Sequence, residues 1–169
     1  MKKLIICALC AICGFTTANA QGKFGHVNTQ EIIQAMPEFT NAQTEMKALS
    51  DQYEADLKSM YDELQKKGEA FKKEQASLPE NIKQRRQQEI AEMQQKIQQS
   101  YQDNQQALQK AEQDKMQPIQ KKLLDAISAV AKEGSYVYVM DMGVGQPIYI
   151  NTTLSTDVTA QVKAKLGLK

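Results

Sequence analysis

The sequence is poor in the residue types from which active sites and nucleic-acid binding surfaces are usually built. Its 169 residues include three cysteines, one histidine and no tryptophan, and aromatic residues make up 6% of the chain. The cysteines, Cys7, Cys10 and Cys13, all lie near the N-terminus. Because none follows them, the remaining sequence excludes thiolate catalysis, cysteine-bound metals and structural disulfides. The few aromatic residues also argue against a stacking platform for single-stranded nucleic acid.

Residues 1–20 are typical of a secretory signal peptide. Lys2 and Lys3 make its start basic, an apolar run follows over residues 4–15, and small residues precede a cleavage site predicted between Ala20 and Gln21. The apolar run is too short to span a bilayer, and no second run of about 18 apolar residues follows it. We therefore expect an exported, soluble chain; the alternative is a signal anchor that is retained.

Charge does not point to nucleic acid either. The chain has 21 basic and 20 acidic residues, and loss of Lys2 and Lys3 with the signal peptide leaves 19 against 20, a formal charge of −1. Binding to nucleic acid through its phosphates normally requires a basic surface. We therefore expect no nucleic-acid partner.

Two long runs with a narrow apolar stripe, residues 39–78 and 79–130, make up most of the chain. The stripe repeats every eleven residues, which corresponds to about 3.67 residues per turn and predicts nearly straight helices. Lys, Glu, Gln and Asp flank it, so neither helix is expected to be stable without a partner along its length. In the first run the stripe residues are Met46, Leu49, Tyr53, Leu57, Met60, Leu64, Gly68 and Phe71. In the second run the apolar residues spaced by eleven are Ile97, Leu108, Ile119 and Val130.

Each helix is expected to find its partner in the other. Pro79 cannot continue the first helix but suits the first turn of the second, Glu80 favours that helix's positive end, and Ser77 is a candidate N-cap. A short turn near residues 77–80 makes the helices antiparallel neighbours. At about 1.5 Å per residue the first helix reaches roughly 60 Å, so we expect residues 39–118 to form a projecting arm. The alternative is a compact helical bundle, which needs further helices with wide apolar faces.

Three residues are predicted to shape the arm. Pro118 lies inside the second helix and is expected to mark a kink or hinge where the arm meets the rest of the protein. Gly68 costs about 1 kcal/mol relative to alanine in a helix interior. Asn104 either fixes the register of the two helices or is simply solvated.

The two ends of the chain, residues 21–38 and 119–169, are expected to form a small body. Residues 23–27 predict a strand and residues 29–36 a short helix. Residues 136–140 and 147–150 predict the two strands of a β-hairpin, joined through two glycines.

The last segment of the body predicts one more helix. Val158, Val162 and Leu166 are spaced for a helix that starts at Ser155 or Thr156 and stops at Gly167. The expected fold is therefore α+β and mostly α, with a long antiparallel helical hairpin projecting from a small β-rich body. Because such a body is marginal and its sheet has open edges, we expect it to oligomerise. Candidate residues for that assembly are Val27, Ile32, Ile33, Val137, Val139, Ile148 and Ile150.

Four short segments occur in a fixed order around a Gln- and Lys-rich helical arm: Gly25–Gln30, Ala126–Ala131, Tyr136–Val139 and Asp157–Thr159. In this order the chain resembles the Skp (OmpH-like) periplasmic chaperones of Gram-negative bacteria. The resemblance implies a homotrimer in the periplasm whose three arms enclose a cavity for unfolded outer-membrane β-barrel proteins. Because the sequence has no nucleotide-binding motif, we expect a holdase that works by binding and release alone, without ATP or a cofactor.

Methionine and tyrosine side chains along the arm are candidates for contact with unfolded clients. Such side chains adapt to many shapes and recur on promiscuous binding surfaces. Their helical spacing allows the alternative that they form the seam between the two helices. The candidates are Met46, Tyr53, Met60, Tyr61, Met93 and Tyr101.

Basic residues flank the predicted turn of the arm on both sides. They give the tip a positive charge that the whole chain does not have. Candidate ligands are acidic loops of clients, lipid headgroups and the phosphate groups of lipopolysaccharide. The alternative is a solvated tip that only keeps the arm soluble. The residues are Lys72, Lys73, Lys83, Arg85 and Arg86.

No catalytic or metal-binding pattern is present in the sequence. His26 stands alone in the first predicted strand, and a lone histidine is usually structural. Gly143-Val144-Gly145 lacks the third glycine, the lysine and the following helix of a phosphate-binding loop, so it predicts a turn. We therefore expect a binding protein and not an enzyme. Two alternatives to a chaperone remain: a structural or adaptor protein of the envelope, and a binder of lipopolysaccharide or other anionic polymers.

Overall fold

The computed structural model describes residues 22–143, 147 and 149–168. The predicted signal peptide, its cleavage between Ala20 and Gln21, and the interface candidate Ile148 lie outside the described residues.

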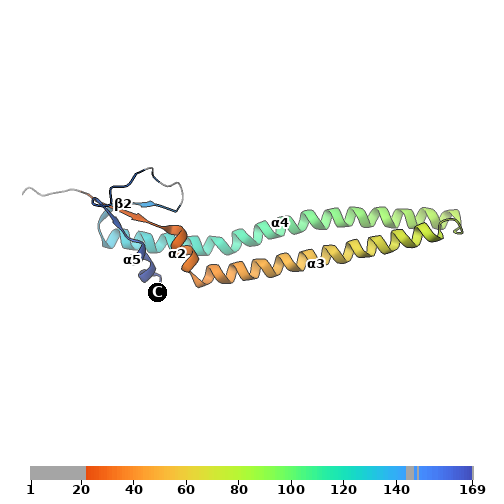
Figure 1. Cartoon of the computed structure of the whole chain (residues 1–169), viewed down its shortest axis with the longest axis horizontal. Coiled ribbons are helices and arrows are strands. Elements are labelled where there is room, and N and C mark those ends of the chain that lie inside the picture. Colours follow the sequence, from red (N-terminus) through yellow and green to blue (C-terminus); the bar gives the residue numbers. More distant parts are fainter. Residues whose placement is uncertain (1–21, 144–146, 148, 169) are drawn as a thin grey trace, which may run out of the picture.

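Two long helices dominate the structure. Helix α3 (Pro37–Glu74) leads away from a small body, and α4 (Glu80–Glu133) returns beside it, so that the pair projects as an antiparallel hairpin (Figure 1). The fold is α+β and mostly α, as the sequence predicts. Helix α4 has 54 residues against 38 in α3, so its last third continues into the body. Within the described residues, no helix is long and apolar enough to cross a membrane.

The turn at the arm's tip differs from the prediction in two details. Pro79, expected in the first turn of α4, stands just before the helix as its N-cap residue, and Ser77 does not cap that helix. Its hydroxyl donates to the Glu74 carbonyl at 2.9 Å, at the end of α3, and α4 begins after Pro79 without a side-chain cap. The N-cap prediction for Ser77 is wrong because its hydroxyl is used at the end of α3, where it donates to a carbonyl, and not at the start of α4.

The sheet has three parallel strands in the order β2-β1-β3, with β1 (Lys23–Val27) between β2 (Tyr136–Asp141) and β3 (Ser155–Asp157). The predicted hairpin of residues 136–140 with residues 147–150 is therefore wrong. Because α4 runs back past the sheet, the chain enters β2 from the same end as β1, and the two strands pair in parallel. The chain then crosses to the other edge of β1, and residues 147, 149 and 150 form no strand.

Two short helices complete the body. Helix α2 (Thr29–Ala35) follows β1 and is capped by the Asn28 side chain, which accepts from the Glu31 amide. Helix α5 (Thr159–Lys165) starts later than predicted, because Ser155 and Thr156 are taken up by β3. The predicted stop at Gly167 is confirmed: this glycine follows α5 with a φ of 72°, a left-handed conformation that suits a residue without a side chain.

The core lies where α4 passes under the sheet and the short helices. Its buried residues come from β1, α2, α4 and the segment around α5, and a second, smaller cluster sits at the root of the arm. The main cluster consists of Val27, Ile32, Leu123, Ala126, Val130, Val158 and Val162. The root cluster consists of Met36, Ala42 and Ile119. Helix α4 thus runs without a break from the arm into the body and stays helical through Pro118; the hinge role of this proline stays a prediction.

Candidate functional site

The two arm helices meet along the stripe that the sequence predicts. All eight stripe residues of α3 from Met46 to Phe71 are partly buried, while most residues between them are exposed. On α4, Ile97 and Ile119 are buried at 3% and 4% exposure. The eleven-residue period therefore marks the contact between the helices.

This seam is weakly apolar at several points along its length. On α4, Ser100, Asn104 and Lys115 are partly buried at seam positions, and each brings a polar group to the contact. Gly68 on α3 leaves open space, because a Cβ built there would meet nothing within 4 Å. Such a seam stabilises the arm less than a continuous apolar stripe would.

Three ion pairs join the arm helices. Lys122 pairs with Glu38, Lys115 with Glu45, and Arg86 with Glu74 at 3.7 Å. The Lys122 ammonium, through its hydrogen bond, lowers the pKa of the Glu38 carboxyl from its ordinary value. These pairs are solvent-exposed, so each contributes little to stability, but they fix how the helices face one another.

Open grooves follow the seam between the two helices. One at the arm's root has a volume of about 480 Å³ and is lined by Phe39, Ala42, Gln43, Met46, Glu112, Lys115 and Met116. A second, of about 330 Å³, lies farther out and is lined by Tyr61, Leu64, Gln94, Ile97, Gln98 and Tyr101. A third, of about 510 Å³, lies near the tip and is lined by Leu64, Gly68, Phe71, Lys72, Gln75, Gln87, Ile90 and Gln94.

The six client-contact candidates divide into two groups. Met46, Tyr53, Met60 and Met93 are partly buried at seam positions, in keeping with the alternative that they join the helices. Tyr61 and Tyr101 are exposed, at 56% and 52%, and lie on opposite walls of the same groove. These two tyrosines are the ones whose aromatic surface is available to a ligand.

The outward face of the sheet is apolar, and among the residues that the structure describes no helix covers it. In β1, Gly25 and Val27 are buried against the helices, so Phe24 and His26 face outward. Parallel pairing places Tyr138 and Met140 beside them, and the Phe24 and Tyr138 rings lie 4.8 Å apart. Side chains from the segment after β2 extend this apolar face around a shallow groove. Its exposed members are Tyr138, Met140, Tyr149 and Leu154.

The interface candidates occupy different places relative to this face. Val27 and Ile32 are 2% and 0% exposed inside the protomer's own core, while Val137 is 65% exposed. Ile33, Val139 and Ile150 are partly buried. Sequence reasoning missed Phe24, Tyr138, Met140, Tyr149 and Leu154 as surface residues. The alternation of aromatic and aliphatic residues in β2 was the available signal, but the wrong hairpin assignment obscured which face each side chain takes.

Residues 23–166 match the model of the family described as outer membrane protein (OmpH-like). The chain belongs to the OmpH-like family. It also resembles a crystal structure of a protein from Caulobacter crescentus CB15 described as a candidate outer membrane chaperone (OmpH-like). The TM-score is 0.74 at 14% sequence identity, over 86% of this chain and 83% of that one, and at this identity the likeness shows the fold. No curated protein matches the sequence.

The basic residues at the tip of this OmpH-like arm differ in how they are paired. Lys83, Arg85 and Arg86 each lie within 3.6 to 3.7 Å of a carboxylate oxygen. Lys72 and Lys73 are exposed, and within the described residues neither forms an ion pair. Among the five, these two lysines are thus the most available to an anion.

The only histidine of this OmpH-like chain takes part in a small polar cluster on the sheet. His26 Nδ1 lies 2.9 Å from the Ser155 hydroxyl, and Asp157 is its direct neighbour on β3. Burial raises the pKa of Asp157, but hydrogen bonds from Thr159 and the charge of His26 outweigh that effect, so the pKa lies below its ordinary value. Asp157 accepts the Thr159 amide at 2.8 Å at the start of α5. The cluster therefore holds β3 and α5 in place.

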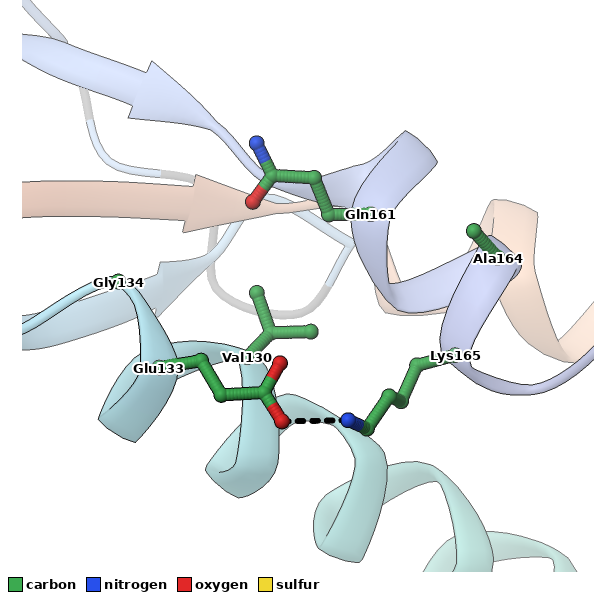
Figure 2. Close-up of a pocket in the computed structure, with 6 residues that line it drawn as sticks. All are labelled: Val130, Glu133, Gly134, Gln161, Ala164 and Lys165. Atoms are coloured by element: carbon green, nitrogen blue, oxygen red, sulfur yellow. Dashed lines mark hydrogen bonds and ion pairs between the residues drawn. The ribbon is translucent and has the colours of Figure 1, made fainter.

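A cleft between the end of α4 and α5 has a volume of about 450 Å³ (Figure 2). Glu133 and Lys165 form an ion pair across it, while Val130 and Ala164 form its apolar walls. The pair neutralises both charges and fastens α5 to α4. Within the part of the chain that the structure describes, no group of three or more His, Cys, Asp or Glu side chains could hold a metal ion.

Proposed function

We propose that this protein is a periplasmic holdase chaperone, independent of ATP, that binds unfolded outer-membrane β-barrel proteins between the arms of a trimer and prevents their aggregation. The observation that carries the proposal is the arm: a two-helix projection about 38 residues long on its outgoing side, with shallow grooves of mixed lining along its seam. An unfolded barrel protein exposes alternating apolar residues and unpaired strands. A ligand of that kind requires many weak contacts and no sequence-specific site.

The open sheet face supports the trimer. Tyr138, Met140, Tyr149 and Leu154 are between 42% and 78% exposed, and contiguous apolar surface of this kind commonly marks an interface. Both edge strands of the sheet also have unpaired backbone groups, which natural proteins cover or pair. Three bodies joined through these surfaces bring three arms to one side, where they engage one client together and gain affinity through multivalency.

Light scattering tests the holdase proposal. An unfolded outer-membrane β-barrel protein is diluted from urea into buffer with or without the chain lacking residues 1–20, at low micromolar concentration. We expect aggregation to be suppressed at about three copies per client, equally with and without ATP. Unchanged aggregation contradicts the proposal and favours an envelope spacer or adaptor.

A second proposed activity belongs to the tip, where Lys72 and Lys73 have no acidic partner among the described residues. We propose that the basic tip binds phosphate groups of lipopolysaccharide or anionic lipids through charge-assisted hydrogen bonds. Such contacts weaken as salt screens them.

Changing the five tip residues tests this second activity. A variant with glutamine at positions 72, 73, 83, 85 and 86 is expected to lose at least about fivefold in affinity for lipopolysaccharide and for vesicles with equal parts of phosphatidylglycerol and phosphatidylcholine. The matched control changes the same number of exposed lysines elsewhere: Lys47, Lys58, Lys96, Lys110 and Lys121. If both variants keep the affinity and salt dependence of the unchanged protein, the tip does not bind these anions.

A further inference from the structure

We propose that each arm has two chemically different edges, and that client segments dock only on the edge that carries the three grooves. This inference rests on the proposed holdase function, and it adds which surface of the arm does the binding and what chemistry it selects.

One edge of the arm is closed by the cross-helix ion pairs. The step of seven residues from Glu38 to Glu45 on α3 is matched by the step from Lys122 to Lys115 on α4. The Arg86–Glu74 pair keeps the same register farther out. Three pairs in one register form a line of charged side chains along a single edge of two antiparallel helices.

The grooves follow a different line. Phe39, Tyr61 and Lys72 are separated by multiples of eleven residues on α3, so at about 3.67 residues per turn they form one straight row. Each of the three grooves contains one residue of this row. On α4 a second row is formed in the same way by Ile90, Tyr101 and Glu112, with one in each groove.

The two lines lie on opposite edges of the arm. With about 98° per residue, the acids of the ion pairs lie roughly 100° to 160° around α3 from the groove row, all in the same rotational sense. The basic partners are displaced from the groove row of α4 in that same sense, by roughly 30° to 100°. Rotation in one sense past the contact brings two antiparallel helices to the same edge. The ion pairs therefore share one edge and the grooves open on the other, and Lys115, which also lines the root groove, lies at the boundary between the two.

The middle groove suits an uncharged, apolar segment. The groove that contains Tyr61 and Tyr101 has only tyrosine, leucine, isoleucine and glutamine in its lining, so it offers no charge to an anion. A second arm is a poor occupant, because within the described residues Tyr61 and Tyr101 are the only large hydrophobic side chains of the arm that are exposed. An arm has little else that is apolar to insert.

The spacing of the grooves suits an extended polypeptide. From Phe39 to Tyr61 the row covers roughly 33 Å, and from Tyr61 to Lys72 roughly 16 Å, at 1.5 Å per helical residue. An extended chain at about 3.3 Å per residue bridges these steps with about ten and about five residues. It turns every second side chain to the same face, so segments of an unfolded barrel protein reach successive grooves without a fixed sequence.

Site-specific photo-crosslinking separates the two edges. A benzophenone side chain replaces Gln43 or Gln98, which line grooves, or Gln52 or Lys96, which lie on the ion-paired edge. All four residues are exposed. Each protein is irradiated with an unfolded outer-membrane β-barrel protein diluted from urea, and suppression of aggregation is measured on the same sample. We expect at least about fivefold more client adduct from the groove edge.

The other outcomes contradict either the two-edge inference alone or the holdase proposal as well. Equal adduct from both edges, more adduct from the ion-paired edge, or adducts only between arms, with aggregation still suppressed, overturns the two-edge inference and leaves the holdase proposal standing. No suppression by any of the proteins, or by the unchanged chain, overturns the holdase proposal and this inference with it.

A pair of variants gives an independent check. The double variant Tyr61→Gln with Tyr101→Gln removes the aromatic walls of the middle groove. Both positions are exposed and glutamine is a good helix former, so the helices should be kept. We expect client affinity to fall about five- to tenfold. Glu38→Gln with Glu45→Gln changes the other edge and is expected to leave affinity unchanged. Helical circular dichroism confirms that both variants fold. If both variants lose affinity equally, or neither does, the inference is wrong.

Discussion

Single side chains fix the body at the points where strands give way to helices. At the end of β2, the Asp141 carboxylate accepts the Thr29 hydroxyl at 2.6 Å and the Thr29 amide at 3.2 Å, at the start of α2. At the end of β3, Asp157 does the same for the Thr159 amide at the start of α5. A carboxylate at the start of a helix is favourable because its oxygens accept hydrogen bonds from the free amides there. These two carboxylates therefore link the sheet to the helices that cover it.

Asp157 gives this protein a pH dependence with a definite sign. Its pKa in the folded protein lies below its ordinary value, so its contribution to stability is present at pH values above the ordinary aspartate pKa of about 3.9 and is lost as pH falls through the folded pKa. We expect Asp157→Asn to melt at a lower temperature than the unchanged protein at pH 7, and the gap to narrow between pH 5 and pH 3. Melting followed by circular dichroism at fixed protein concentration measures this. A gap that stays constant with pH would contradict the role of the carboxylate.

At the scale of elements, the arm holds together through a seam that is narrow and locally empty. The seam residues of α3 are only partly buried, and Gly68 leaves part of the contact unfilled near the groove at the tip. Because glycine also lacks helix propensity, the outer part of the arm is expected to be the first part of the long helices to open.

Gly68→Ala tests the seam. A Cβ at this position meets nothing within 4 Å, so we expect the variant to be more stable by about 0.5 to 1 kcal/mol, through helix propensity and a less flexible unfolded chain. Urea unfolding at constant protein concentration measures the change. Gly134→Ala is the matched control, because a Cβ there would lie 2.2 Å from the Tyr136 ring, and we expect it to destabilise. A destabilising effect of Gly68→Ala would mean that the seam is filled.

The long elements were predictable from the sequence and the sheet topology was not. The eleven-residue stripe from Met46 to Phe71 determines the seam, because the face that a residue takes on a long helix follows from its spacing in the sequence. The direction of β2 depends on where α4 ends relative to β1, which no local pattern shows. β3, with the sequence Ser-Thr-Asp, has no apolar alternation at all, and it forms because β1 offers a free edge. The exposure of Tyr61 and Tyr101 was not predictable either, because it depends on how both helices are rotated about their axes. The sequence therefore placed these two tyrosines in one group with residues that lie in the seam.

At the scale of the whole molecule, the body and the arm have different structural roles. The body buries its own core around α4 and leaves one sheet face apolar and open. The arm adds length and shallow grooves but little core. A lone protomer thus has an uncovered face and a single arm, and both become useful in an assembly in which bodies pack together and several arms surround one client.

The mass of the complex tests that assembly most directly. The chain lacking residues 1–20 is mixed with an unfolded outer-membrane β-barrel protein diluted from urea, and size-exclusion chromatography with multi-angle light scattering gives the mass of what elutes. We expect the mass of three copies of the chain without client, and of three copies with one client when client is present. A monomer at every concentration, or a client that aggregates and never elutes with the chain, would contradict it.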